Sequence, residues 1–264
     1  MEELLAELAG GDDSEKGDSG RVGIVGGSIE FAGPPALSGL AALRTGTDVA
    51  KALTSEVALE VVAGFSPNVL TERFVGDVLR PDSVGKVLAV AEWSDALVVG
   101  PGLETPTPKA VREVVERVAV PTVVDATAIE HALDCDLSGS VVTPDSAEVE
   151  EIEAEHGSLA SFAATSGAVV VSKGAEDEIY AGDERFAVEE GTPAMTVAGT
   201  GDTLAGVVGS LLGTGLDPVD AARLGPWIVG RAGELAAEEY GSGLVATDVI
   251  ERIPAAVDAG SGPN

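Results

Sequence analysis

From Arg21 onward the chain alternates short apolar runs with longer amphipathic stretches. Runs that are apolar at every position are typical of strands buried on both faces, as in a parallel sheet, and the stretches between them predict covering helices. The pattern therefore predicts an α/β fold with a central, mainly parallel sheet and helices on both faces. The predicted strands lie at 22–25, 48–53, 96–100, 122–126, 140–143 and 168–172.

Helical periodicity fills most of the remaining chain, and after residue 200 the pattern is almost wholly helical. Residues 177–190 predict a β-hairpin that turns at Ala181-Gly182-Asp183. We expect residues 21–264 to form one domain, preceded by an acidic helix at 1–9 and a Gly/Asp/Ser-rich segment to residue 20. The predicted helices lie at 34–45, 82–92, 107–118, 147–155, 202–213, 218–238 and 246–252.

Charge narrows the possible partners. The formal net charge is −30, which excludes nucleic acid and anionic membrane surfaces as partners because the whole surface repels phosphate. Hydrophobic residues make up 45% of the chain, so the acidity belongs to the surface of a folded protein. Only 5 of the 15 basic residues are lysine, which favours adaptation to molar salt. The acidic start and the lack of a long apolar run predict a cytoplasmic protein.

The segment AGTGDTLAG at 198–206 is the most informative motif. Its small residues let the backbone approach a ligand, and the free amides of the following helix favour an anion such as phosphate. Asp202 has two interpretations here. It caps the helix, which is the common role of aspartate at this position, or it is a base that faces the bound anion.

Two further glycine-rich loops follow predicted strands, at 22–37 and 98–106. In open α/β sheets, ligands bind beyond the carboxyl ends of strands, so the three loops predict one common rim. Asp145 and Glu148 share one side of a predicted first helical turn, where they form a capping pair or bind the magnesium of a nucleotide. Lys173 follows a strand and either neutralises a phosphate or pairs with Asp177.

In this order the segments resemble the ribokinase-like superfamily, most closely its ADP-dependent NAD(P)H-hydrate dehydratases. The resemblance runs from Arg21 to Pro254. It rests on VGGSIEFAGPP, AALRTGTDVAKAL, GPGLE, VVDATAIEHAL, TPDSAEVEEI, SKGAEDEIY, GTPAMTVAGTGDTLAGVVGSLLGTGLDP and GRAGELAAEEYGSGLVATDVIERIP.

The resemblance implies an enzyme that restores NAD(P)H from its hydrate, with magnesium and with ADP as co-substrate, while the sequence leaves ATP open. It implies that Asp202 is catalytic and contacts the substrate hydroxyl, beside the amides of Thr200 and Gly201. A second group of residues is expected along the nucleotide: Lys173, Gly174, Ala175, Glu176 and Asp177. A third group is expected around the substrate: Gly33, Pro34, Gly102 and Asp145.

One departure from the dehydratase pattern bears on the substrate. The dehydratases usually carry histidine where this chain has Asp145, and the pair Asp145 and Glu148 is closer to the acidic motif of the superfamily's kinases. Two alternatives therefore stand beside the dehydratase: a small-molecule kinase for a vitamin precursor, and a non-catalytic nucleotide-binding paralogue. The resemblance also implies a homo-oligomer and a separate epimerase protein as partner.

Overall fold

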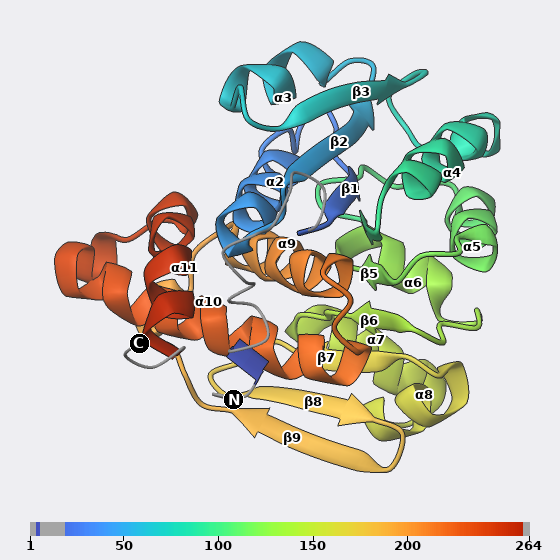
Figure 1. Cartoon of the computed structure of the whole chain (residues 1–264). Coiled ribbons are helices and arrows are strands. Elements are labelled where there is room, and N and C mark those ends of the chain that lie inside the picture. The colour runs from blue at the N-terminus through green and yellow to red at the C-terminus, as the bar shows by residue number, and fades with distance from the viewer. Residues whose placement is uncertain (1–3, 6–18, 261–264) are drawn as a thin grey trace.

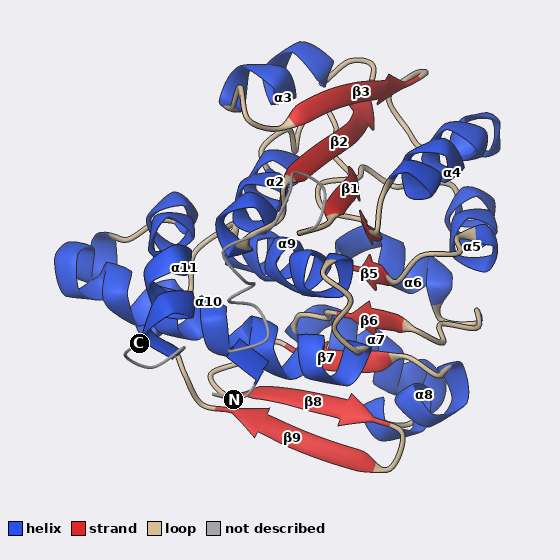
Figure 2. Ribbon diagram, viewed as in Figure 1, coloured by secondary structure: helices blue, strands red, loops and turns tan. Residues whose placement is uncertain are grey.

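The computed structural model describes residues 4–5 and 19–260, and it confirms the α/β fold as a nine-stranded sheet between helical layers (Figures 1 and 2). The strands are ordered β3-β2-β1-β4-β5-β6-β7-β8-β9. Their bounds are β1 (Arg21–Val25), β2 (Val49–Ser55), β3 (Leu70–Phe74), β4 (Ala96–Val99), β5 (Thr122–Val124), β6 (Ser140–Val142), β7 (Val169–Ser172), β8 (Asp177–Ala181) and β9 (Glu184–Val188).

The strands from β1 to β7 pair in parallel. The last two strands, β8 and β9, form the predicted antiparallel hairpin at one edge of the sheet. The central strands are short and apolar, and β4 and β5 are buried along their whole length. Side chains on both faces of these strands are therefore in the core, as expected for parallel strands covered on both sides.

One helical layer packs on the face of the sheet that carries Val22, Ile24 and Val98. The opposite face carries Val25, Val99 and Val124 and packs on the second layer (Figure 2). The first layer contains α2 (Pro34–Thr45), α9 (Thr200–Gly213), α10 (Pro218–Tyr240) and α11 (Ala246–Gly260). The second contains α4 (Val84–Trp93), α5 (Pro108–Arg117), α6 (Ile129–Ala132), α7 (Ser146–His156) and α8 (Leu159–Ser166).

The chain reverses its direction of travel across the sheet between β1 and β4. It passes from β1 outward to β3 and then returns to place β4 on the other side of β1. Parallel sheets bind their ligands beyond the carboxyl ends of strands at such a reversal. The loops that follow β1 and β4 are the two glycine-rich loops at 22–37 and 98–106, so the topology places both of them at the expected position.

Among the described residues, four of the α-helices and strands have no counterpart in the sequence prediction: α3 (Leu59–Phe65), β3, α6 and α8. Strand β3 pairs with β2 alone and forms an edge, where its LTERF sequence exposes more side chains than it buries. An edge strand of this kind lacks the continuous apolar run that marks the central strands. Only one residue of α3, Val62, is buried, so its helical pattern is weak as well.

Most of the predicted segment 1–20, including Leu8, lies outside the described residues. Leu5 is described and is completely buried in the same core cluster as Val22, Ile24 and Val98, and Leu4 packs against that cluster. This part of the segment is therefore integrated into the core of the domain.

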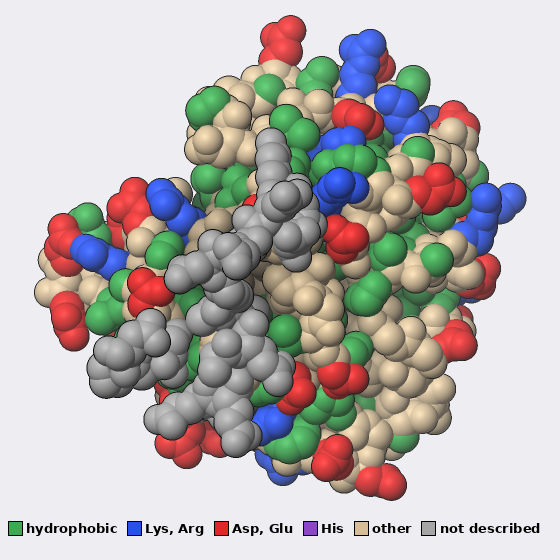
Figure 3. All heavy atoms as spheres, in the orientation of Figure 1, with side chains coloured by type: hydrophobic (Ala, Val, Ile, Leu, Met, Phe, Trp, Pro, Cys, Tyr) green, Lys and Arg blue, Asp and Glu red, His purple; other side chains and the backbone are tan. Residues whose placement is uncertain are grey.

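Acidic side chains are dispersed over the face shown in Figure 3. Among the described residues, the structure has no helix with the length and apolar character needed to cross a membrane.

Candidate functional site

The loops after β1 and β4 lie against each other, as the sequence predicts. The amide of Gly27 donates to the carbonyl of Pro101 at 2.9 Å. Gly102 has a φ of +69°, and a Cβ on it would lie 2.6 Å from the carbonyl oxygen of Phe31 and 3.0 Å from Cγ of Pro34. Only glycine allows this close approach, so Gly102 and Pro34 share one wall. Gly33, beside Pro34, faces open space.

The start of α9 is held against α2 and α11. Gly199 occupies the N-cap position with a φ of +96°, and a Cβ there would lie 2.6 Å from Leu37 and 2.9 Å from Ala246. Ser38 Oγ donates to the carbonyl of Asp202 at 2.9 Å, which fixes the first turn. Because the first amides of a helix have no partner within the helix, those of Thr200 and Gly201 suit an anion.

Asp202 lies in the first turn of α9, three residues after the N-cap. The interpretation of Asp202 as the helix cap is therefore wrong, since Gly199 occupies that position. Burial raises the pKa of Asp202 from 3.8 to about 7, with a further increase from nearby Asp125 and an opposing decrease from Lys173. A carboxyl group with a pKa near neutral pH is suited to accept a proton during catalysis.

The ammonium group of Lys173 binds the carboxylate of Asp125, with Nζ and Oδ1 2.9 Å apart. Thr143 Oγ1 donates to the same Oδ1 at 2.7 Å. The expected alternative, in which Lys173 pairs with Asp177, is wrong: Asp177 Oδ1 instead accepts from the amide of Gly174 at 2.9 Å. Burial raises the pKa of Asp177. The local bond to Gly174 joins Asp177, the first residue of β8, to the turn that precedes it.

Lys173 also reaches the start of α9. A Cβ built on Gly201 would lie 3.3 Å from Lys173 Nζ. A positive charge therefore stands beside the first amides of the helix, and both attract an anion. Gly174, Ala175 and Glu176 follow at the rim, where all three are exposed. The nucleotide-binding residues expected from the sequence thus divide into a half-buried lysine and an exposed turn.

Asp145 and Glu148 form the predicted capping pair at the start of α7. Asp145 Oδ1 accepts from the amides of Ala147 and Glu148, and Glu148 Oε2 accepts from the amide of Asp145 at 2.7 Å. Burial raises the pKa of Glu148 to about 7, while Lys173 lowers it. The structural role of this pair is confirmed.

The same two carboxylates also offer hard oxygen donors of the type that magnesium prefers. Within residues 4–5 and 19–260, no group of three or more acidic, histidine or cysteine side chains could hold a metal ion. The described residues therefore do not form a metal site by themselves, and magnesium binding by Asp145 and Glu148 stays a prediction.

Asp125 is the site residue that the sequence analysis did not single out. It lies at the carboxyl end of β5, in the stretch VVDATAIEHAL, and its side chain is 3% exposed. A polar residue directly after a buried apolar run was the available signal. Its partner could not be inferred, because Lys173 is 48 residues away along the chain.

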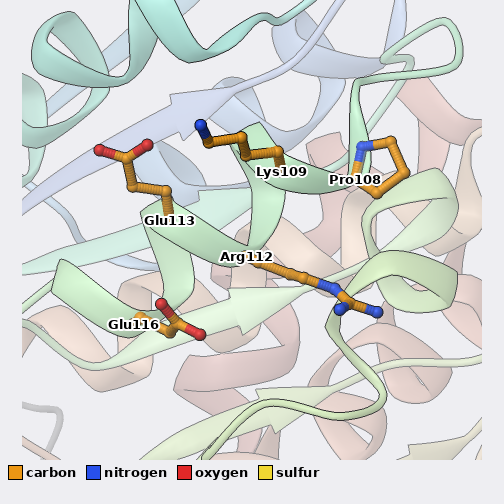
Figure 4. Close-up of a pocket in the computed structure, with 5 residues that line it drawn as sticks. All are labelled: Pro108, Lys109, Arg112, Glu113 and Glu116. Carbon is orange, nitrogen blue, oxygen red and sulfur yellow. The ribbon is translucent and has the colours of Figure 1, made fainter.

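A depression of about 590 Å³ on the surface of α5 is distinct from this site (Figure 4). It is lined by Pro108, Lys109, Arg112, Glu113 and Glu116. None of the candidate residues lines it. Arg112 is already bound to Asp134 at 3.0 Å, so part of the positive charge there is neutralised.

The order of the strands and the two helical layers define a ribokinase-like fold. The structure is similar to a ribokinase-like superfamily protein from Enterococcus faecalis, with a TM-score of 0.82, 22% identity and coverage of 100% of this chain and 96% of that one. It is also similar to the ADP/ATP-dependent NAD(P)H-hydrate dehydratase of Bacillus subtilis, co-crystallised with ATP and magnesium. That comparison has a TM-score of 0.79 and 24% identity and covers 98% of this chain and 97% of the other.

Sequence comparison narrows this class to one family. The model of the NAD(P)H-hydrate dehydratase family matches residues 22–255. The ADP-dependent (S)-NAD(P)H-hydrate dehydratase of Haloterrigena turkmenica is 52% identical over 240 residues, which are 91% of this chain and 93% of that relative. The chain belongs to the NAD(P)H-hydrate dehydratase family, and the family expected from the sequence motifs is confirmed.

Proposed function

We propose that the protein converts (S)-NAD(P)H hydrate back to NAD(P)H, using ADP as the phosphoryl donor and releasing AMP and phosphate. One observation carries the proposal beyond family membership: the half-buried carboxyl group of Asp202 lies with Lys173 at the first turn of α9. This arrangement holds an anion and a base together, which is what transfer of a phosphoryl group to a hydroxyl requires.

The chemistry begins with the hydroxyl group of the hydrated ring. Its oxygen attacks the terminal phosphorus of ADP, the bond to the bridging oxygen breaks, and AMP leaves. Asp202 accepts the hydroxyl proton and later releases it to water. The ring carbon–oxygen bond then breaks and the neighbouring carbon loses a proton, so phosphate leaves and the ring double bond is restored. Phosphorylation drives this step because phosphate is a far better leaving group than hydroxide.

The remaining residues bind and orient the two substrates. The amides of Thr200 and Gly201 and the ammonium group of Lys173 neutralise the transferred phosphoryl group. The exposed turn Gly174-Ala175-Glu176, with Asp177, follows the nucleotide. Asp145 and Glu148 would hold magnesium, which would neutralise charge on the nucleotide phosphates. The wall made by Gly33, Pro34 and Gly102, together with Asp145, borders the hydrated ring.

A direct assay tests the proposal. Purified protein in molar potassium chloride with magnesium is incubated with NADH hydrate and either ADP or ATP, and recovery of the NADH absorbance and release of phosphate are followed. We expect recovery that depends on one nucleotide and is lost in Asp202→Asn. The matched control, Asp183→Asn, changes an exposed aspartate in the β8–β9 turn and should leave turnover unchanged.

The same assay separates the alternatives. A stable phosphate ester in place of free phosphate and NADH would identify a small-molecule kinase. Nucleotide binding without any turnover would identify a non-catalytic paralogue. Wild-type turnover in Asp202→Asn would overturn the role of that residue whichever reaction is found.

We further propose that the protein works in the cytoplasm, in molar salt, as a homo-oligomer, and that a separate epimerase supplies the (S) form of the hydrate. The large negative charge supports the salt adaptation. Exposed apolar side chains on α3 and β3 support an interface between copies, since contiguous apolar surface is uncommon on monomers. They are Val61, Phe65 and Leu70, with Val75 beside them.

A further inference from the structure

Asp125, Thr143 and Lys173 follow the carboxyl ends of three neighbouring strands, β5, β6 and β7. The ladder of backbone hydrogen bonds continues beyond the strand ends: the amide of Asp125 donates to Val99 at 2.9 Å, and that of Thr143 donates to Val124 at 3.1 Å. The amide of Lys173 donates to Pro144 at 3.0 Å. The backbone therefore holds the three residues at the same edge of the sheet, with Lys173 two residues further along its strand than Thr143.

The backbone around Asp125 is unusually constrained. Ala126, the next residue, has a φ of +51°, a conformation that costs a non-glycine residue about 1–2 kcal/mol. Gly100 has a φ of +127°, and a Cβ on it would lie 1.7 Å from the carbonyl oxygen of Asp125. Strained backbone that is tightly enclosed in this way is concentrated at functional sites. The strain points to a required position for the Asp125 side chain.

We infer that Asp125 is a positioning residue, which holds the ammonium group of Lys173 at the start of α9 so that it can bind the nucleotide phosphate. The inference rests on the proposed function for the identity of that phosphate. Asp125 does not itself reach the ligand in this assignment: it acts through Lys173, at 2.9 Å, and Thr143 orients its carboxylate from the other side at 2.7 Å.

The negative charge of Asp125 also affects the pKa of Lys173. Burial disfavours the charged form of Lys173, and Asp125 is the strongest of the groups that counteract it, through both its charge and its hydrogen bond. Glu148 and Asp145 act in the same direction with smaller effects, so the pKa of Lys173 is raised, and the carboxyl groups of Asp202 and Asp177 also interact with its charge. Without Asp125 the burial penalty is less well balanced, so the pKa of Lys173 should fall.

Binding of ADP as a function of pH tests this inference. ADP affinity is measured by calorimetry in molar potassium chloride from pH 7.5 to pH 9.5, for the wild type and for Asp125→Asn. We expect constant affinity in the wild type across this range. In Asp125→Asn the affinity should be lower throughout and should fall further as pH rises to 9.5, because a growing share of Lys173 loses its proton. A variant that only loosened the structure would lose affinity equally at every pH.

Two variants serve as matched controls. Thr143→Val removes the other partner of Asp125 but keeps the charge, so its affinity should not fall at alkaline pH. The double variant Asp125→Asn with Lys173→Arg restores a cation that keeps its proton, and the alkaline loss should disappear. An alkaline loss of the same size in Thr143→Val, or one that persists in the double variant, would overturn the inference.

Asp125→Glu covers the case in which Asp125→Asn does not fold. It keeps the charge but displaces the carboxylate by one methylene group, so we expect kcat to fall at least about tenfold with ADP affinity independent of pH. A wild-type kcat in Asp125→Glu would contradict a positioning role. These outcomes are distinct from failure of the proposed function, because ADP binding is measured without the second substrate, whereas the proposed function fails if the wild type has no turnover.

Discussion

Replacing Asp202 by asparagine should increase stability while it removes activity. The pKa of Asp202 rises from 3.8 to about 7 in the folded protein, chiefly because burial disfavours the carboxylate. Between these two values the folded state binds more protons than the unfolded state, so the stability of the wild type falls as pH rises. Above pH 7 the buried carboxylate destabilises the folded state to its full extent. Asparagine keeps the shape of the side chain and carries no charge, so it avoids this penalty.

The magnitude follows from the size of the pKa change. At about 1.4 kcal/mol for each factor of ten in proton affinity, a rise from 3.8 to about 7 corresponds to at most about 4 kcal/mol. Asp202 is only partly buried, and solvent screening reduces this to about 2 kcal/mol. For a protein of this length that gain raises Tm by about 6 °C. At pH 5 the gain should be about half as large.

Thermal unfolding is followed by circular dichroism at pH 5 and pH 8, in molar potassium chloride. It measures the increase in Tm of Asp202→Asn over the wild type at each pH. The exposed control Asp183→Asn should shift Tm by less than about 1 °C at either pH. An Asp202→Asn protein that is no more stable than the wild type at pH 8 would refute the reasoning. So would a gain of equal size at both pH values, since the argument requires the gain to grow as the carboxyl group ionises.

Four further predictions concern activity, packing and salt. Turnover should rise with pH and level off above about pH 7 as Asp202 becomes ionised, which a rate profile from pH 5.5 to 9 checks. Gly206→Ala should lower the free energy of unfolding by about 2 kcal/mol in denaturant titrations, because its Cβ would lie 2.1 Å from the carbonyl oxygen of Ser38. Leu5→Ala should lower it by about 3 kcal/mol in the same titration, since Leu5 is completely buried. Transfer to low salt should unfold the wild type through self-repulsion of its net charge of −30, and dichroism at a series of salt concentrations would show a flat response if this is incorrect.

The sequence by itself determined the class of fold and the positions of most central strands. Continuous apolar runs such as those of β4 and β7 are a local property of the chain, because a strand buried on both faces needs apolar residues at every position. The glycine-rich loops were also visible, since close approach of backbone requires residues without side chains. Weakly buried elements such as β3 and α3 were missed because exposed edges carry no such pattern.

Only the tertiary structure decided which charged groups meet. Asp125 and Lys173 come from β5 and β7 and are joined by the parallel order of the sheet, which no local pattern encodes. The sequence alone also left open whether Asp202 caps α9 or faces a ligand. The structure shows that Gly199 is the residue at the N-cap position. The physical reason is that apolar periodicity is short-range, whereas a pKa near 7 arises from burial and charges brought together by distant segments.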